Sequence, residues 1–351
     1  MNLEIEKLPE FDNHELVSFF FDKKTGLKGF LAIHNTNLGP ALGATRFWHY
    51  QSEEEALLDA LRLSRGMAYK CALARLPYGG GKGVIMADEK MTKTPEMIRA
   101  YAKVIDNLHG RFYTGEDVGM NKNDVRLMAE KTSYVIGKIP NKSDNPPYWT
   151  ALGVLSAALA GLEEINGIPQ VRNTTFAIKG LGKVGSQLCK MVIENGGSVI
   201  AADINSRKTK LATKNFPSIK IVSPSVIHRQ EVDIFASCAL GGCLNQITIP
   251  ELKCKVVCGG ANNQLANPED GVRLHRRKIL YIPDYLANSG GLINVVAELR
   301  PGGYSQSWVE KKCHQIQATT KKIISLSRRY NKPTSVVADR LAEKMFNGKS
   351  R

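Results

Sequence analysis

Two lysines and an aspartate in the N-terminal half have residue types and a spacing that suit proton transfer. Lys82 follows three consecutive glycines, in a turn expected to hold the lysine close to the backbone. Burial and a nearby like charge both lower the pKa of a lysine, and Lys70 is the expected source of that charge. Asp117 is expected at the carboxyl end of a short strand over residues 111–114. These are candidate acid–base groups, although each taken singly also fits a solvated surface lysine or a loop-capping aspartate.

A glycine pattern in the C-terminal half predicts a dinucleotide site. Gly180, Gly182 and Gly185 form G-x-G-x-x-G directly after an expected strand and at the start of an expected helix. The first glycine permits a tight turn, the second lets a pyrophosphate approach the backbone, and the third lets the helix pack close to the strand. Asp203 ends the next strand, near the distance expected for the acid that binds the ribose. A glycine turn that only packs is the alternative.

The acid at the end of this second strand bears on the choice of cofactor. Asp203 would accept a hydrogen bond from a ribose 2′-hydroxyl and would repel a 2′-phosphate, which favours NAD over NADP. Arg207 and Lys208 follow closely and weaken that preference. The predicted cofactor is NAD.

Local patterns predict the elements that position the N-terminal groups. Apolar runs at 17–21 and 29–34, around a Lys-Lys-Thr-Gly sequence, predict a β-hairpin. Ser52 and Glu55 have the spacing of a capping box that opens a helix through Met67. The other elements expected in this half are a strand at 84–86, a helix from Thr94 to about Gly110 that begins with Pro95, and a helix at 124–134.

A polar, proline-rich stretch at residues 137–147 is expected to be a hinge between two domains. The predicted domains are residues 1–140, for substrate binding and catalysis, and residues 141–330, for dinucleotide binding. A C-terminal helix over about 331–351 is expected to pack back on the first domain. Beyond the hinge, helices alternate with strands, which predicts a parallel α/β sheet. Its expected elements are a helix at 151–166 and strands at 175–178, 198–202, 220–222, 232–236, 255–258 and 279–282.

Several segments, in order along nearly the whole chain, resemble the glutamate/leucine/phenylalanine/valine dehydrogenase family, and its leucine dehydrogenase branch most closely. The segments are residues 38–46, 66–70, 79–82, 115–119, 180–185, 238–241, 260–264, 283–291, 333–334 and 338–343. The resemblance implies an α/β fold with an N-terminal substrate and oligomerisation domain, a doubly wound Rossmann domain for NAD, and an active cleft between them. It also implies a homo-oligomer.

The family resemblance implies a reversible oxidative deamination, in which an L-amino acid and NAD give a 2-oxo acid, ammonia and NADH. Lys70 matches the lysine that holds the substrate α-carboxylate. Lys82 matches the catalytic lysine that activates water, and Asp117 the carboxylate that moves protons to and from the amine. Hydride leaves Cα only when the nitrogen lone pair is free, so such a base is needed. The residues matched to the cofactor site are Gly180, Gly182, Lys183, Val184, Gly185, Asp203, Thr150, Cys238, Ala239 and Asn262.

The resemblance also bears on the substrate side chain. Family members that use glutamate place a lysine and a hydroxyl around its γ-carboxylate, and Leu42 and Val295 stand at those positions here. A carboxylate buried there would have no partner, so an apolar side chain is expected, with leucine, valine or isoleucine first. Leu292, Gly115 and Asn262 match other positions near the substrate. Space left by Gly115 keeps phenylalanine and tryptophan open as alternatives.

Composition limits the remaining function classes. Hydrophobic residues make up 43% and charged residues 23%, which is typical of a globular protein. No apolar run is long enough for a membrane span, and the N-terminus lacks a secretory pattern. The seven cysteines, uneven in spacing and without zinc-like pairing, predict reduced thiols in the cytoplasm and no metal site.

The positive net charge of +15 is concentrated near the C-terminus, where residues 311–351 hold eleven Lys and Arg against Asp339 and Glu343. At helical spacing these cations share one face, opposite an apolar line. The expected structure is a docked helix with a solvated cationic face, so neither a membrane nor a nucleic-acid partner is expected. The alternative is a repurposed family member that binds a polyanion through this helix. The apolar line consists of Val309, Ile316 and Ile323.

Overall fold

The computed structural model describes residues 4–138 and 145–348. The chain divides into two compact units. Unit 1 comprises Met1–Asp144, Glu298–Tyr304 and Ala342–Arg351, and unit 2 comprises Asn145–Ala297 and Ser305–Leu341. Unit 2 thus extends beyond residue 330, where the sequence places the end of the second domain. Of the predicted hinge, residues 139–144 lie outside the described part of the chain.

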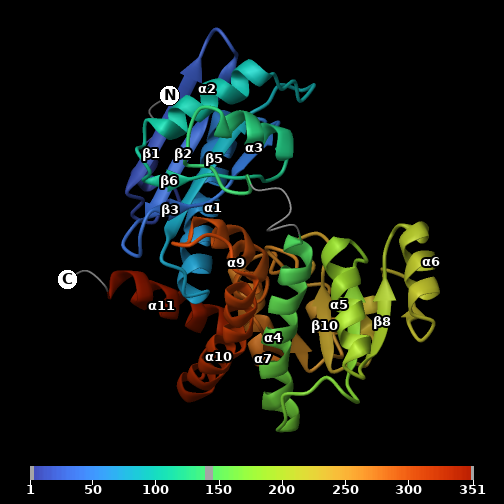
Figure 1. The fold of residues 1–351 in the computed structure, drawn as a ribbon. Coiled ribbons are helices and arrows are strands. Elements are labelled where there is room, and N and C mark those ends of the chain that lie inside the picture. The colour runs from blue at the N-terminus through green and yellow to red at the C-terminus, as the bar shows by residue number, and fades with distance from the viewer. Residues whose placement is uncertain (1–3, 139–144, 349–351) are drawn as a thin grey trace. The chain divides into compact units, whose positions relative to one another are not determined.

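Unit 1 is built on a mixed sheet with the order β1-β2-β5-β3-β6, in which β4 also pairs with β5 (Figure 1). The first two strands form the expected antiparallel hairpin, and the second pairs antiparallel with β5. β3 and β4 both run parallel to β5. The bounds are β1 Leu16–Asp22, β2 Leu27–Asn35, β3 Ala41–Leu42, β4 Thr45–Trp48, β5 Gly79–Met86 and β6 Phe112–Tyr113.

The central strand β5 differs from the expectation. The sequence predicts a glycine turn followed by a strand at 84–86, whereas the strand begins at Gly79 and includes Lys82. Glycine has a low strand propensity, so the pattern pointed to a turn. Close packing against α1 on one face and α2 on the other makes this glycine-rich segment a strand despite its low strand propensity.

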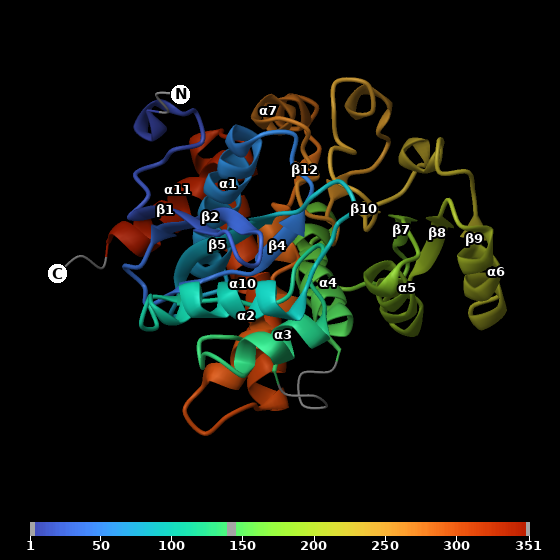
Figure 2. The ribbon, with the colours of Figure 1, turned by 90° about the horizontal axis from the view of Figure 1, so that it is seen from above.

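Helices cover both faces of this sheet. α1 (Glu53–Leu73) lies on one face, and α2 (Pro95–Asp106) and α3 (Lys122–Ala129) lie on the other (Figure 2). Side chains alternate along β2 accordingly, because successive residues of a strand point to opposite faces. Phe30 and Ala32 pack with α1, and Leu31 packs with α2 and α3.

Polar caps begin these helices close to where the sequence predicts. The hydroxyl of Ser52 accepts from the backbone of Glu55 at 3.0 Å. The Glu55 carboxylate accepts from Gln51, one residue before the cap, so only half of the predicted capping box forms. α1 continues beyond Met67 to Leu73, and α2 ends at Asp106 rather than near Gly110.

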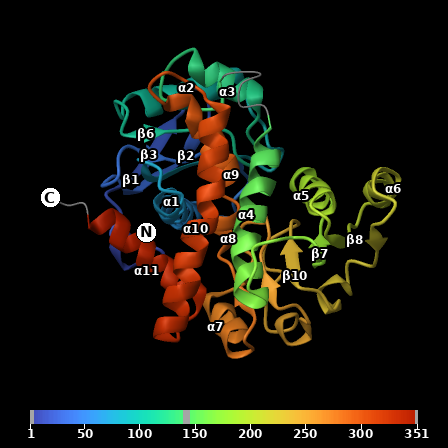
Figure 3. The same cartoon turned by 60° about the horizontal axis from the view of Figure 1, so that its bottom comes forward.

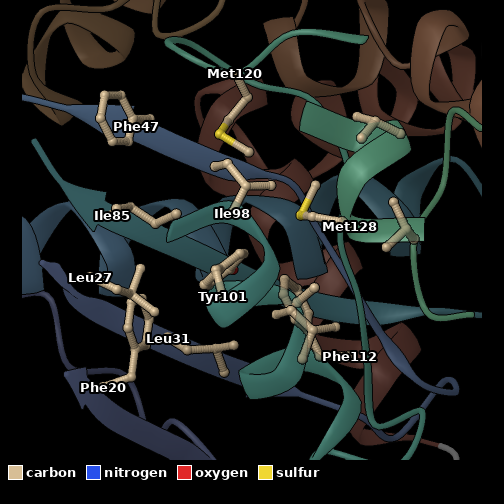
Figure 4. Packing of buried hydrophobic residues seen from close by; sticks show 14 of the residues in the cluster. Phe20, Leu27, Leu31, Phe47, Ile85, Ile98, Tyr101, Phe112, Met120 and Met128 are labelled. Atoms are coloured by element: carbon tan, nitrogen blue, oxygen red, sulfur yellow. The ribbon is translucent and has the colours of Figure 1, made fainter. Parts of the chain in front are cut away.

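The core of unit 1 lies between the sheet and the helices α2 and α3. Figure 4 shows these side chains converging from β1, β2, β4, β5 and β6 and from both helices. Tyr101 of α2 is fully buried, and its hydroxyl meets that of Thr45 on β4 at 2.7 Å. Thr45 also meets Thr114, just after β6, at 2.6 Å. This hydroxyl cluster (Thr45, Tyr101 and Thr114) connects the two strands to α2.

Unit 2 contains the expected parallel sheet, with the order β12-β11-β10-β7-β8-β9. The strand order reverses between β7 and β10, which is the point where doubly wound folds bind their ligands. The strands are β7 Thr175–Lys179, β8 Ser198–Ala202, β9 Lys220–Ile221, β10 Ile234–Ser237, β11 Val256–Val257 and β12 Leu280–Tyr281. The predicted doubly wound fold is confirmed.

The helices of the remaining chain are α4 Pro146–Asn166, α5 Lys183–Glu194, α6 Ser206–Asn215, α7 Pro268–Arg276, α8 Asp284–Ala287, α9 Gly290–Val296, α10 Gln306–Tyr330 and α11 Thr334–Asn347. Short 3-10 helices lie at Ile5–Lys7, Ile227–Arg229, Ile249–Glu251 and Ala297–Leu299. α11 is the helix expected over about 331–351, and its residues divide between the two units after Leu341.

The basic C-terminal segment forms α10, which runs beside α4 (Figures 1 and 3). The apolar line at 309, 316 and 323 is buried, as expected for a docked amphipathic helix. Two cations of the opposite face pair with α4: Lys321 with Glu163, and Arg328 with Glu164 at 2.9 Å. Part of the cationic face is therefore neutralised within unit 2.

No helix in the described part of the chain is long and apolar enough to cross a membrane. The seven cysteines all lie in described residues and are free thiols. Burial raises the pKa of several of them, Cys71 to about 12 and Cys238 to about 11. Among the described side chains, no group of three or more His, Cys, Asp or Glu could hold a metal ion.

Candidate active site

The glycines around Lys82 allow β5 to pack closely on both sides. A Cβ atom at Gly80 would overlap the backbone of α1 at Ala68, and one at Gly83 would overlap the hydroxyl of Tyr101. Lys82 is in phase with Gly80, so its side chain points to the α1 side of the sheet. Only 5% of Lys82 is exposed. The glycines thus place a lysine amine in a nearly dry position.

Backbone hydrogen bonds fix the segment that carries Asp117. After β6 the chain continues alongside β4: Thr45 N donates to the Gly115 carbonyl at 3.0 Å, and Phe47 N to the Val118 carbonyl at 2.9 Å. A turn after Asp117 contains Gly119, whose φ is +78° and whose Cβ would overlap the Phe47 carbonyl oxygen. Asp117 therefore lies at the carboxyl end of β6, as predicted.

The buried Lys82 forms an ion pair with the partly exposed Asp117, in which Nζ donates to Oδ2. Burial lowers the pKa of Lys82, and the negative charge of Asp117 offsets part of that effect. Burial alone would raise the pKa of Asp117, but Lys82 and Arg46 hold it below its usual value. The pair thus combines an ionised carboxylate with an amine that loses its proton more easily than a free lysine. This arrangement suits proton transfer.

Arg46 and Asp59 also belong to this cluster, although the sequence did not single them out. Arg46 Nη1 donates to Asp59 Oδ2 at 2.8 Å, and Arg46 Nε lies 3.4 Å from Asp117 Oδ2. The sequence predicted that the positive charge of Lys70 would lower the pKa of Lys82. In the structure, the main like charge that does so is that of Arg46. Residues that meet only through tertiary packing show no recognisable spacing in the sequence, which is why this cluster was not predicted. A polar residue on the buried face of α1, Asp59, was the one available signal.

The other predicted substrate residues of unit 1 lie on or next to its sheet and on α1. Lys70 is half-buried in the last turn of α1, and Leu42 is fully buried in β3. Gly115 follows β6, and a Cβ there would lie 2.9 Å from Cγ1 of Ile136, so Ile136 packs closely against this glycine.

Three further predicted substrate residues belong to unit 2. Leu292 and Val295, one helical turn apart on α9, are both partly exposed, while Ile293 and Asn294 are buried. They therefore share one face of the helix. The side-chain oxygen of Asn262 accepts from Asn288 Nδ2 at 2.7 Å, which fixes its amide.

The glycine loop between β7 and α5 has the geometry that the fingerprint predicts. Gly180 has φ +99°, a conformation that favours glycine. A Cβ at Gly182 would meet nothing within 4 Å, so the backbone there is open to a ligand. A Cβ at Gly185 would overlap the Gly180 carbonyl oxygen, which explains the third glycine.

The start of α5 can receive an anion. No side chain caps this helix at Gly182, so the backbone N–H groups of its first turn, at Lys183 and Val184, remain available. Nearby, Asp203 Oδ2 accepts from the Leu181 backbone at 2.7 Å, and Lys208 Nζ lies 3.8 Å from the same oxygen. The loop thus brings the start of α5 close to Asp203, the acid that the sequence predicts to bind a ribose.

The remaining predicted cofactor residues lie on neighbouring elements of unit 2. Cys238 and Ala239 follow β10, and a Cβ at Gly180 would lie about 3 Å from their backbone atoms. Thr150 is on α4, where its hydroxyl donates to the Pro146 carbonyl at 2.8 Å. The open backbone and the uncapped helix fit a dinucleotide pyrophosphate.

Two family models match the chain. One, described as "Glu/Leu/Phe/Val dehydrogenase, dimerisation domain", matches residues 14–134. The other, described as "Glutamate/Leucine/Phenylalanine/Valine dehydrogenase", matches residues 202–341. The first match lies within unit 1, and the second covers much of unit 2.

Individual proteins match over almost the full length. A leucine dehydrogenase of Geobacillus stearothermophilus is 45% identical over 343 residues, which are 97% of this chain and 93% of that enzyme. An L-tryptophan dehydrogenase of Nostoc punctiforme is 42% identical over 339 residues, 96% of this chain and 95% of that enzyme. A crystal structure of L-tryptophan dehydrogenase from Nostoc punctiforme has a TM-score of 0.87 at 41% identity and covers 97% of each chain.

Proposed function

Because the chain belongs to the Glu/Leu/Phe/Val dehydrogenase family, we propose that it catalyses the reversible, NAD-dependent oxidative deamination of an apolar L-amino acid. Leucine, valine or isoleucine is the proposed substrate, with the 2-oxo acid and ammonia as products. The ion pair of the buried Lys82 with Asp117 is the observation that carries the proposal.

Unit 1 supplies the acid–base groups in this proposal. Lys70 binds the α-carboxylate of the substrate, and Asp117 removes a proton from its ammonium group so that the nitrogen lone pair becomes available. A nicotinamide dinucleotide held by the glycine loop of unit 2 would supply the acceptor for the hydride of Cα. Lys82 then activates water for attack on the resulting imine, and its lowered pKa supports this role because a neutral amine can accept a proton.

Unit 2 supplies the cofactor site in this proposal. The open backbone at Gly182 and the first turn of α5 receive the pyrophosphate, and Asp203 receives the ribose hydroxyls. Thr150, Cys238, Ala239 and Asn262 contact the nicotinamide half. NAD is preferred because the Asp203 carboxylate would repel a 2′-phosphate.

In this proposal, the residues that contact the substrate side chain are Leu42 and Gly115 of unit 1 and Leu292 and Val295 of unit 2. None of the four offers a charge or a hydroxyl to a substrate carboxylate. An aromatic substrate is the second candidate, because an L-tryptophan dehydrogenase is 42% identical to this chain. The position of Ile136 against Gly115 favours the smaller, branched side chains.

A homo-oligomer in the cytoplasm completes the proposal. The family model over residues 14–134 describes a dimerisation domain. Within this range, Phe19 and Phe21 on the end strand β1 are 51% and 60% exposed, which suits a surface covered by a second copy. Seven free thiols support a reducing compartment.

An NADH absorbance assay with the twenty L-amino acids tests the function. Leucine, valine and isoleucine should give the highest kcat/KM. Alanine, three carbon atoms shorter, should be poorer than leucine by about thirtyfold or more, since burial of each CH₂ contributes ~0.8 kcal/mol. Glutamate should be rejected more strongly because its carboxylate would find no partner. Turnover of glutamate comparable to leucine would contradict the apolar pocket, and a tenfold preference for tryptophan or phenylalanine would support the second candidate.

A further inference from the structure

Arg46 lies between two carboxylates from different elements of unit 1. One is Asp59 of α1, at 2.8 Å from Nη1, and the other is Asp117, at 3.4 Å from Nε. Arg46 alternates along β4 with Thr45 and Phe47, whose side chains are buried on the α2 side of the sheet. Its own side chain therefore points to the α1 side, and only 24% of it is exposed.

Asp59 is itself held by further donors. Its Oδ2 also accepts from the Tyr50 hydroxyl at 2.7 Å, and its Oδ1 from Arg62 Nη2 at 2.7 Å. Burial raises the pKa of Tyr50, so its hydroxyl remains a donor across the physiological pH range. Asp59 therefore offers Arg46 a fixed anchor rather than a mobile surface partner.

We propose that Arg46, anchored by Asp59, is a positioning residue that orients the carboxylate of Asp117 and keeps it ionised for proton transfer. Lys82 from β5 donates a hydrogen bond to Oδ2, and the Arg46 guanidinium from β4 forms an ion pair with the same oxygen at 3.4 Å. Two positive charges from neighbouring strands therefore hold the carboxylate in place. This inference rests on the proposed function, in which Asp117 takes a proton from the substrate ammonium.

The charges around the pair define the expected effect on pH dependence. Arg46 on β4 acts on both Asp117 and Lys82, and Asp59 on α1 acts on Lys82 and on Arg46. The positive charge of Arg46 lowers the pKa of Asp117 and of Lys82. Its removal should raise both pKa values. Oxidative deamination needs Asp117 ionised and Lys82 neutral, so the pH profile should move to higher pH.

A cavity of about 540 Å³ borders Arg46, and its lining also includes Asp59, Tyr50 and Val118. Trp48, which also lines it, is 47% exposed. A small cation can therefore reach Asp59 from solvent when the Arg46 side chain is removed. This makes chemical rescue a practical test.

The first experiment compares Arg46→Ala and Arg46→Lys with the native enzyme. Arg46→Ala should lower kcat about a hundredfold, the typical cost of a misplaced catalytic group. The kcat/KM profile for deamination should move up by about one pH unit, the lower end of the effect of a charge at this range. Arg46→Lys, which keeps the charge, should restore the native pH profile while kcat stays reduced. The KM for NAD should not change, because the glycine loop is in unit 2.

The second experiment adds guanidinium ions to Arg46→Ala, below their denaturing concentration. Activity should rise at least several-fold and saturate, whereas sodium chloride at equal ionic strength should have no such effect. Arg62→Ala is the matched control: it removes the other guanidinium from Asp59 without touching Asp117. Arg46 and Tyr50 still hold Asp59 in that variant, so its kcat should fall far less than that of Arg46→Ala. Its pH profile should stay native, and guanidinium ions should not raise its activity.

The outcomes separate this inference from the proposed function. A native enzyme without dehydrogenase activity on any amino acid would contradict the proposed function. An active native enzyme with an unchanged pH profile and no rescue in Arg46→Ala would overturn only the positioning role. Circular dichroism and thermal unfolding identify a misfolded variant. If Arg46→Ala is misfolded, Arg46→Lys is the test: a native pH profile with a reduced kcat supports the positioning role, and a native kcat overturns it.

Discussion

At the scale of single residues, burial lowers the pKa of Lys82, and the carboxylate of Asp117 lies within hydrogen-bond distance of its amine. Lys82→Ala should lower kcat by about 10²–10⁴-fold, the usual contribution of a positioned acid or base. NADH binding should remain close to native, because the glycine loop belongs to unit 2. Steady-state kinetics and NADH fluorescence titration measure the two effects. Retention of more than about a tenth of the native kcat would contradict the catalytic role.

In the proposed function, Asp203 determines the choice between the two nicotinamide cofactors. NAD should be preferred over NADP by at least about tenfold in kcat/KM, or ~1.4 kcal/mol. The carboxylate is fixed by the Leu181 backbone, so it cannot turn away from a 2′-phosphate without losing that bond. Asp203→Ser should reduce the preference. Equal kcat/KM values for the two cofactors would indicate that Lys208, 3.8 Å from Asp203, pairs with the phosphate instead.

Short sequence patterns indicated Lys82 and Asp117 one by one, but they did not predict the cluster of charged residues that surrounds this pair. Lys82, Asp117 and the three glycines each have a recognisable neighbourhood, because a turn, a strand end or a fingerprint is encoded within a few residues. Arg46 and Asp59 reach the site from β4 and α1 through side-chain contacts between distant positions. Such contacts follow from tertiary packing, which local spacing does not encode.

At the scale of elements, β5 depends on glycine for its position between α1 and α2. Gly83→Ala should destabilise unit 1 by about 1–3 kcal/mol, because the added methyl group would overlap the Tyr101 hydroxyl. It should also lower kcat, since Lys82 is the preceding residue of the same strand. Thermal unfolding and steady-state kinetics check both effects.

Gly66 in α1 provides a matched control for that substitution. A Cβ at Gly66 would meet nothing within 4 Å, and the residue is exposed in a helix. Gly66→Ala should therefore stabilise the protein by about 0.5–1 kcal/mol through helix propensity. Equal effects of the two substitutions would contradict the packing explanation for Gly83.

The elements with clear periodicity were predicted closely, and those set by packing were not. The hairpin of β1 and β2 and all six parallel strands of unit 2 occur within a few residues of their predicted positions. The glycine-rich start of β5 was wrongly predicted as a turn, since close contacts on both faces, rather than side-chain propensity, make it a strand.

At the scale of the whole molecule, the net charge of +15 does not by itself indicate a polyanion site. Lys321 and Arg328 of α10 pair with acids of α4, and the apolar side of α10 is buried. RNA and DNA should therefore show no detectable binding at low salt in a fluorescence anisotropy assay. Binding that falls linearly with salt on a log–log plot would instead favour the polyanion alternative.

The positions of the seven cysteines allow local unfolding of each unit to be measured with native thiols alone. Cys71 is fully buried and is the single cysteine of unit 1, while the other six belong to unit 2. A thiol with a raised pKa reacts slowly with alkylating reagents until the structure around it opens. Mass spectrometry after timed alkylation would therefore give the opening rate of α1 without any introduced label, separately from the rates of the Rossmann sheet.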